Sequence, residues 1–244
     1  MNAPLLDVLG LHRRFGGVVA VADCSFSVRE NTITGLIGPN GSGKTTVLNM
    51  VSGYLSPDSG TIRFAGHEAG RCNPTAMYRR GLSRTFQRAR ILPELDVLAN
   101  LLVAVPQHGL NLLRPGHDRA TVDRAMHLLE EFRLLRYAEL RAGELSYGQQ
   151  KLLEFASVLM ARPRMVLLDE PTAGVNQIMI DLMVERLLEF HAAGITFLIV
   201  EHNMEFVMGI CDSIIVMDRG RTLREGTPAD VQGDKSVIDA YLGD

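Results

Sequence analysis

The eight residues from Gly38 to Thr45, GPNGSGKT, constrain this chain more than any other segment. They match the Walker A pattern GxxxxGK[ST] and directly follow Ile33 to Ile37, a nearly continuous apolar run that predicts a buried parallel strand. Glycines let backbone N–H groups surround a phosphate, and the helix after the loop adds its positive N-terminal end. Strand, loop and helix in this order predict an α/β fold built around a phosphate-binding loop.

Each part of this loop has a predicted role. Lys44 neutralises the β- and γ-phosphate oxygens, and Thr45 supplies a hydroxyl to Mg²⁺. The residues expected to surround the phosphates of a nucleotide are Gly38, Pro39, Asn40, Gly41, Ser42, Gly43, Lys44 and Thr45. A plain glycine-rich turn is the alternative, and the strand before the loop argues against it.

A second apolar strand, Met165 to Leu168, is followed by two carboxylates in the manner of a Walker B motif. Asp169 emerges at the strand end, where ligands of parallel sheets bind, and is predicted to hold Mg²⁺ directly or through water. Glu170 is the candidate general base, since a carboxylate one residue beyond the metal ligand can orient and deprotonate a water. An exposed strand end would look the same, but the phosphate loop favours the functional interpretation.

The rest of the chain divides into an α/β part and a helical part. Short antiparallel strands are predicted at 5–9 and 24–28, buried strands at 195–200 and 213–217, and a helix over 180–191. From about 88 to 160 helical spacing dominates, with the apolar stripe Val122, Met126, Leu129 and Phe132 and a loop over 106–118. We predict one domain, 1–244, in which 1–87 and 161–244 form a P-loop NTPase (RecA-like) core with an antiparallel β subdomain and 88–160 an inserted α-helical subdomain.

Composition limits the partners. A net charge of −3 and a sequence pI near 6.2 give no basic field for nucleic acid. The three cysteines, Cys24, Cys72 and Cys211, lack the spacing of a zinc site or redox pair and fit a reducing cytosol. No secretory signal is visible, and no apolar run approaches the roughly 18 residues that span a bilayer. We therefore expect any membrane association to go through a partner.

Residues 145 to 150, LSYGQQ, resemble the LSGGQ signature motif of ABC ATPases, which separates that family from kinases and GTPases. Ser146 and the backbone of Gly148 lie where a helix is predicted to begin, and a helix N-terminus attracts anions. The resemblance implies that they and Gln149 receive the γ-phosphate of ATP held by the opposite subunit of a head-to-tail dimer. A simple N-cap is the alternative.

Further positions resemble the remaining landmarks of the ABC family. Gln87 resembles the Q-loop glutamine, which senses Mg²⁺ and the attacking water, and His202 resembles the switch histidine that contacts the γ-phosphate. Phe15 resembles the aromatic platform for adenine, although it could equally pack in the core. The resemblance also places Thr46 among the nucleotide contacts. ATP and Mg²⁺ are the implied cofactors, and Glu170, His202, Gln87 and Lys44 the implied catalytic residues.

The segments LSYGQQ, DEPTAGVN, RTFQRARILPELDVLANLLVA and AYLG resemble the LivG type of ATP-binding subunit of branched-chain amino acid importers across essentially the whole chain. Two residues depart from the general family pattern: Tyr147 replaces the first glycine of the signature, and Asn176 stands where the D-loop has an aspartate. Subunits of importers for urea, amides or other small organic solutes are similar and remain alternatives, as does a soluble ABC ATPase. Exporter subunits share every catalytic motif, and the signature argues against a P-loop kinase.

The resemblance implies an ATP hydrolase at the cytoplasmic face of the bacterial plasma (inner) membrane, attached peripherally. Its implied partners are two transmembrane permease subunits, a second ATPase subunit (a copy or a LivF-like paralogue) and, indirectly, a periplasmic or extracellular solute-binding protein, without nucleic acid. Five arginines beside the Q-loop are either a permease docking surface or a solvated charged face: Arg79, Arg80, Arg84, Arg88 and Arg90.

Overall fold

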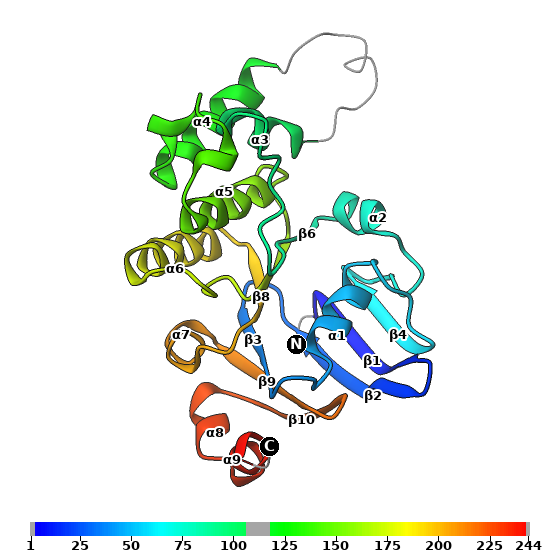
Figure 1. Ribbon diagram of the computed structural model, residues 1–244. Helices are drawn as coiled ribbons and strands as arrows, with labels where there is room; N and C mark the ends of the chain where they lie inside the picture. The colour runs from blue at the N-terminus through cyan, green and yellow to red at the C-terminus, as the bar shows by residue number, and fades with distance from the viewer. Residues whose placement is uncertain (1–2, 106–117, 243–244) are drawn as a thin grey trace. The chain divides into compact units, whose positions relative to one another are not determined.

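A computed structural model describes residues 3–105 and 118–242 of the chain (Figure 1). It consists of two compact units: Met1–Arg84, Arg164–Glu170 and Phe190–Asp244 form the first, and Thr85–Pro163 and Pro171–Glu189 form the second. The loop expected at 106–118 lies, except for residue 118, outside the described residues.

The strands are β1 Leu6–Phe15, β2 Val18–Val28, β3 Ile33–Ile37, β4 Ser59–Phe64, β5 His67–Glu68, β6 Leu82–Arg84, β7 Met165–Asp169, β8 Thr196–Val200, β9 Ser213–Asp218 and β10 Arg221–Gly226. The α-helices are α1 Lys44–Val51, α2 Pro74–Arg79, α3 Val97–Val103, α4 Arg119–Glu131, α5 Tyr147–Leu159, α6 Gln177–Ala192, α7 Met204–Ile210, α8 Pro228–Gln232 and α9 Lys235–Leu242, and short 3₁₀ helices cover Leu135–Tyr137 and Ala142–Glu144.

The first unit is built on a six-stranded sheet of order β10-β9-β3-β8-β7-β6. Strand β3 pairs in parallel with β8 and β9, and β7 pairs in parallel with β6 and β8. Every residue of β3, β7 and β8 is buried, which explains their continuous apolar sequences. The predicted buried strands are confirmed to within one residue. Parallel strands end at one edge of a sheet, so the segments after β3, β7 and β8 share that edge.

A four-stranded sheet of order β2-β1-β4-β5 completes the first unit and confirms the predicted antiparallel subdomain. Pairing of β1 with β2 runs from Leu6 and Val28 to Phe15 and Val18 through several register shifts. Both strands are therefore longer than the predicted 5–9 and 24–28. The shifts interrupt the alternation of apolar and polar residues, so the sequence pattern shows only one end of each strand.

The second unit is helical, and apart from one bridge between Asp96 and Arg141 its described residues form no strand pairing. Its core includes Phe132 and Phe155, whose rings meet edge to face with centroids 5.3 Å apart. The predicted stripe on α4 was wrong at Met126, which is 37% exposed. The buried positions of α4 are Ala125, Leu128 and Leu129, and Phe132 at its C-terminal cap is buried as well.

Residues 171–189 belong to the second unit, whereas the sequence analysis assigned them to the core. They pack on the start of α5: a Cβ at Gly148 would lie 3.3 Å from the Cγ of Met179 and 3.6 Å from a methyl of Val175. This packing follows from long-range contact and has no local sequence signal. The division into one domain with an inserted subdomain stays a prediction.

Candidate functional site

The phosphate loop requires glycine at two positions. Gly38 and Gly43 have φ angles of 149° and 99°, in the region that side chains disfavour. A Cβ on Gly38 would lie 2.1 Å from the carbonyl oxygen of Met217 in β9, and one on Gly43 would lie 2.5 Å from that of Ala20 in β2. Gly43 caps α1 without a side-chain hydrogen bond. The loop is thus held tightly between two strands, with the positive end of α1 at its far side.

Lys44 folds back over this loop. Its Nζ donates to the carbonyl oxygens of Gly38 at 2.8 Å and Pro39 at 2.9 Å, and the residue is only 6% exposed. Burial lowers the pKa of Lys44, while the charges of Glu170 and Asp169 raise it. A buried ammonium held by neutral carbonyls can exchange these partners for phosphate oxygens of opposite charge.

Asp169 is held by an arginine that the sequence analysis placed elsewhere. Its Oδ2 accepts from Nη2 of Arg84 at 2.9 Å, with both side chains at most 5% exposed. Nη1 of Arg84 donates to Oδ1 of Asn49 and Oγ of Ser52, each at 2.8 Å, and both acceptors belong to α1 or its C-terminal cap. Arg84 therefore joins the end of β7 to the helix after the phosphate loop. Its inclusion in an exposed basic surface was wrong.

Glu170 and His202, predicted separately, meet in the structure. Oε1 of Glu170 lies 3.1 Å from Nε2 of His202. Pairing of Asp169 with Val200 brings the ends of β7 and β8 together, and the N–H of Glu170 donates to the carbonyl of Val200 at 2.9 Å. Glu170 adopts a φ of 48°, a conformation that costs energy outside glycine and gathers at functional sites.

The remaining first-unit residues lie at accessible positions. Thr45 is exposed and Thr46 half-buried on the first turn of α1. Phe15 ends β1 at 48% exposure, with the guanidinium carbon of Arg13 5.1 Å from its ring centroid. This exposure excludes the alternative that Phe15 packs in the core, and its role as an adenine platform stays a prediction.

The signature residues begin α5 in the second unit. Oγ of Ser146 accepts from the N–H of Gln149 at 3.4 Å, and Oε1 of Gln149 accepts from the N–H of Ser146 at 2.9 Å. This reciprocal pair is a capping box, so the N-cap alternative describes a real feature of the helix. Ser146 is exposed. The side chain of Gln149, in contrast, is hydrogen-bonded within its own helix, and this does not support its predicted contact with ATP.

Both departures from the family pattern have local structural roles. Tyr147 packs on the D-loop, because a Cβ added to Gly174 would lie 3.2 Å from the Cε1 of Tyr147. Gly174 also has a φ of 72°, so both the close approach of Tyr147 and the backbone conformation favour glycine at this position. Asn176 caps α6 by accepting from the N–H of Met179 at 3.1 Å. The amide oxygen performs this task without the charge of an aspartate.

The predicted site residues are divided between the units. Lys44, Thr45, Asp169, Glu170 and His202 belong to the first, and Gln87, Ser146, Gly148 and Gln149 to the second. Gln87 is exposed and lies in a segment without regular secondary structure.

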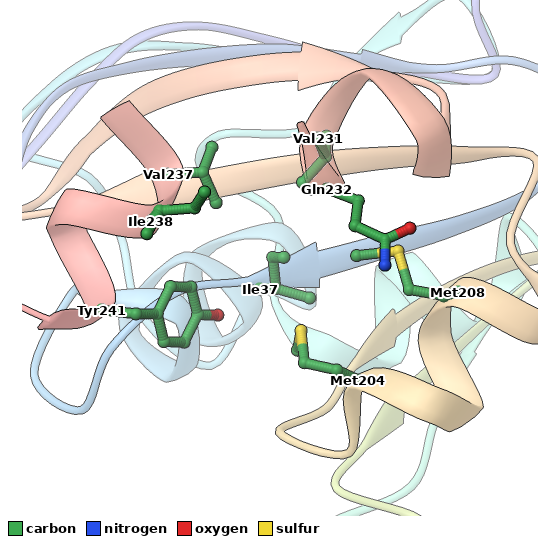
Figure 2. A pocket seen from close by; sticks show the side chains of 8 residues that line it. All are labelled: Ile37, Met204, Met208, Val231, Gln232, Val237, Ile238 and Tyr241. Atoms are coloured by element: carbon green, nitrogen blue, oxygen red, sulfur yellow. The ribbon is translucent and has the colours of Figure 1, made fainter. Parts of the chain in front are cut away.

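An apolar cavity of about 350 Å³ lies in the first unit, beside the strand that leads into the phosphate loop (Figure 2). Its lining comes from the end of β3 and from α7, α8 and α9: Ile37, Met204, Met208, Val231, Gln232, Val237, Ile238 and Tyr241. The backbone N–H of Gly38 donates to the hydroxyl of Tyr241, while burial raises the pKa of that hydroxyl. The C-terminal helix thus contacts the first residue of the phosphate loop, a contact that sequence reasoning missed although AYLG contains Tyr241.

Comparison with known proteins identifies the family. The family model described as ABC transporter matches residues 21–173, a span that contains the phosphate loop, Gln87, the signature, and the carboxylates of Asp169 and Glu170. The chain belongs to the ABC transporter family. As an ABC ATP-binding cassette it binds a nucleotide and hydrolyses ATP. A second family model, described as branched-chain amino acid ATP-binding cassette transporter, matches residues 225–244.

Several relatives of this ABC cassette match it from end to end. The high-affinity branched-chain amino acid transport ATP-binding protein BraF of Pseudomonas aeruginosa is 40% identical over 256 residues, with 100% of both chains covered. LivG of Escherichia coli, of the same description, is also 40% identical with full coverage. A nucleotide-free ATP-binding cassette from an ABC transporter superposes with a TM-score of 0.89 at 34% identity, covering 99% of this chain and 100% of that one. The predicted fold class and family are confirmed. Among the described residues, no helix combines the length and apolarity needed to cross a membrane.

Proposed function

We propose that the chain is the ATP-hydrolysing subunit of an importer for branched-chain or related amino acids. The observation that carries this proposal is the full-length likeness to proteins named for that transport, which includes the C-terminal segment 225–244. That segment supplies five of the residues lining the apolar cavity, so it is part of the folded cassette.

The donor set of the first unit fits Mg²⁺. The hydroxyl of Thr45 and the carboxylate of Asp169 are hard oxygen ligands. Gln87, which belongs to the second unit, carries an exposed amide oxygen of the same kind for its role at the ion and the attacking water. The ion would neutralise charge on the β- and γ-phosphates when ATP is bound. Lys44 would give up its carbonyl partners for phosphate oxygens.

Glu170 and His202 act on the water that attacks ATP. Glu170 orients the water and accepts its proton, which is the role of a carboxylate positioned one residue beyond the metal ligand. His202 holds the carboxylate of Glu170 in place at 3.1 Å and reaches toward the γ-phosphate. Phe15 stacks on adenine from its exposed position.

Coupling to transport uses a second ATPase subunit, either a copy of this chain or a LivF-like paralogue. Each ATP binds to the phosphate loop of one subunit, and its γ-phosphate contacts Ser146 and Gly148 at the start of α5 in the other. ADP cannot make that contact, so ATP and ADP favour different arrangements of the pair. This difference in binding is the source of the conformational work done on the permease.

Two permease subunits bind the second unit and hold the chain peripherally at the cytoplasmic face of the membrane. Arg88 and Arg90 are exposed near Gln87, and Leu92 and Val103 are 46% and 57% exposed. A cavity of about 140 Å³ lies there, lined by Arg90, Ile91, Leu92, Asn100, Val103, Ala104, Leu153 and Ser157. Exposed apolar side chains beside positive charge suit a cytoplasmic segment of a permease.

The test is to isolate the tagged chain from detergent-solubilised native membranes and identify its stoichiometric companions by mass spectrometry. We expect two permease chains and a second ATPase subunit. The double variant Arg88→Glu/Arg90→Glu should lose the permease, while Arg79→Glu, a single charge reversal on the first unit, should retain it. Recovery of the chain alone, or with ribosomes or DNA, would overturn the transport assignment. A companion binding protein specific for urea or amides would overturn only the amino-acid assignment.

A further inference from the structure

One face of α5, the helix that begins with the signature, carries three polar side chains. Tyr147, Lys151 and Glu154 occupy positions i, i+4 and i+7, which lie on the same side of a helix. Lys151 and Glu154 are only 2% and 3% exposed, whereas Tyr147 is 43% exposed. Burying charged groups is costly unless hydrogen bonds compensate, so their partners indicate what this face is for.

Lys151 and Tyr147 hold carbonyl groups of the Q-loop, defined here as residues 86–90. Nζ of Lys151 donates to the carbonyl oxygen of Phe86 at 2.9 Å and to that of Gln87 at 2.6 Å. The hydroxyl of Tyr147 donates to the same oxygen of Gln87 at 3.4 Å. Hydrogen bonds from an ammonium are about twice as strong as those between neutral groups. The backbone at Gln87 is therefore fixed by a buried charge.

Glu154 holds the amide groups of the same loop. Its Oε1 accepts from the N–H of Phe86 at 3.1 Å and from the N–H of Arg90 at 3.0 Å. Burial raises the pKa of Glu154, while these N–H donors and the charge of Lys151 lower it. The guanidinium carbon of Arg90 lies 3.5 Å from the ring centroid of Phe86, which closes the loop on itself. Side chains of α5 thus replace secondary structure as partners of the Q-loop backbone.

We infer that Lys151 and Glu154 are positioning residues for Gln87. Their side chains form hydrogen bonds to the backbone at and on either side of Gln87, and so they determine where the side chain of Gln87 can reach. The inference rests on the proposed role of Gln87 at the metal ion and the attacking water. The helix that carries both residues starts at Ser146, the proposed contact to the nucleotide of the opposite subunit. Helix α5 therefore joins a contact made across the dimer to the residue that senses the nucleotide.

A purely structural role for Lys151 and Glu154 predicts a different effect of their substitution on activity. If Lys151 and Glu154 only stabilised the second unit, weakening them would reduce activity independently of Gln87. If they act through Gln87, their effect on kcat disappears once the Gln87 side chain is removed, while their effect on Tm remains. A double-mutant cycle separates the two, because residues that act as a unit are not additive.

The experiment measures kcat and KM for MgATP hydrolysis, together with Tm, in the full chain. Glu154→Leu removes the acceptor of both N–H groups, and Glu154→Gln keeps an oxygen in its place as the matched control. Each variant is made with Gln87 and with Gln87→Ala. Lys151→Met and Lys151→Arg form an equivalent pair where Glu154→Leu does not yield folded protein.

We expect Glu154→Leu to lower kcat about tenfold to a hundredfold with little change in KM, the scale of loss caused by displacing a catalytic group. Glu154→Gln should retain most of the activity, and in the Gln87→Ala background Glu154→Leu should cause no further loss of kcat. Multiplicative losses would overturn the positioning role and leave the role of Gln87 standing. An unchanged kcat in Gln87→Ala alone would overturn the proposed role of Gln87, and this inference with it.

Discussion

Replacing Arg84 with methionine should destabilise the first unit strongly. The Arg84–Asp169 ion pair has a separation of 2.9 Å between side chains that are 4% and 5% exposed. Removing one partner of such a pair leaves the other charge buried without it and costs about 3–5 kcal/mol. The hydrogen bonds to Asn49 and Ser52 are lost as well, at about 1 kcal/mol each, which favours the upper end of that range. Since domains are stable by only about 5–15 kcal/mol, the loss is a large fraction of the total.

Urea unfolding followed by circular dichroism measures this loss, because the chain has no tryptophan to serve as a fluorescent probe. With a urea dependence of about 2–3 kcal/mol per molar, the midpoint should fall by about 1–2 M. Arg79→Met is the matched control, since Arg79 is exposed and its substitution should change stability by no more than about 0.5 kcal/mol. The double variant Arg84→Met/Asp169→Leu should regain part of the loss, because it no longer buries a carboxylate that has lost its arginine.

Two results would refute this reasoning. Equal midpoints for Arg84→Met and Arg79→Met would mean that the buried pair contributes nothing to stability. A double variant no more stable than Arg84→Met would mean that the loss of stability does not come from the buried charge of Asp169.

Two further predictions concern catalysis and the cysteines. Glu170→Gln should reduce phosphate release about a hundredfold or more while ATP binding persists, because only the proton acceptor is lost; unchanged turnover would remove Glu170 from the base role. In the native chain at pH 8, half-buried Cys72 should react with a thiol reagent well before Cys24 and Cys211, both buried with a raised pKa. Burial raises the pKa of Cys211 to about 12, which leaves a thiolate fraction on the order of 10⁻⁴ at pH 8. Rapid labelling of all three thiols without urea would contradict the burial.

Functional positions with local signals could be predicted from the sequence. The phosphate loop is a short continuous segment with a defined backbone conformation. It requires glycine where strands β2 and β9 approach it closely. The buried strands could be predicted because parallel strands covered on both faces are apolar throughout. The sequence pattern gave a wrong prediction in two situations. It missed part of β1, where the register shifts, and it placed Met126 on the apolar stripe although that residue is exposed.

Charged residues showed the limit of sequence reasoning most clearly. Arg84 resembled a member of an exposed basic run, but its partner Asp169 is 85 residues away in the chain. Lys151 and Glu154 look like the solvent face of a helix, yet they bind a loop 64 to 68 residues earlier. A charged side chain is exposed to solvent or buried according to which segments pack over it. The periodicity of the sequence does not show which of the two occurs.

The sequence by itself determined the family, the α/β class and the residues nearest the chemistry, because these depend on short segments whose backbone geometry dictates their residue types. Only the tertiary structure decided how those residues are held. It placed Glu170 against His202, Arg84 against Asp169, and the polar face of α5 against the Q-loop. The physical reason is that each of these contacts joins distant segments, and hydrogen bonds between such segments exist only after the core has brought them together.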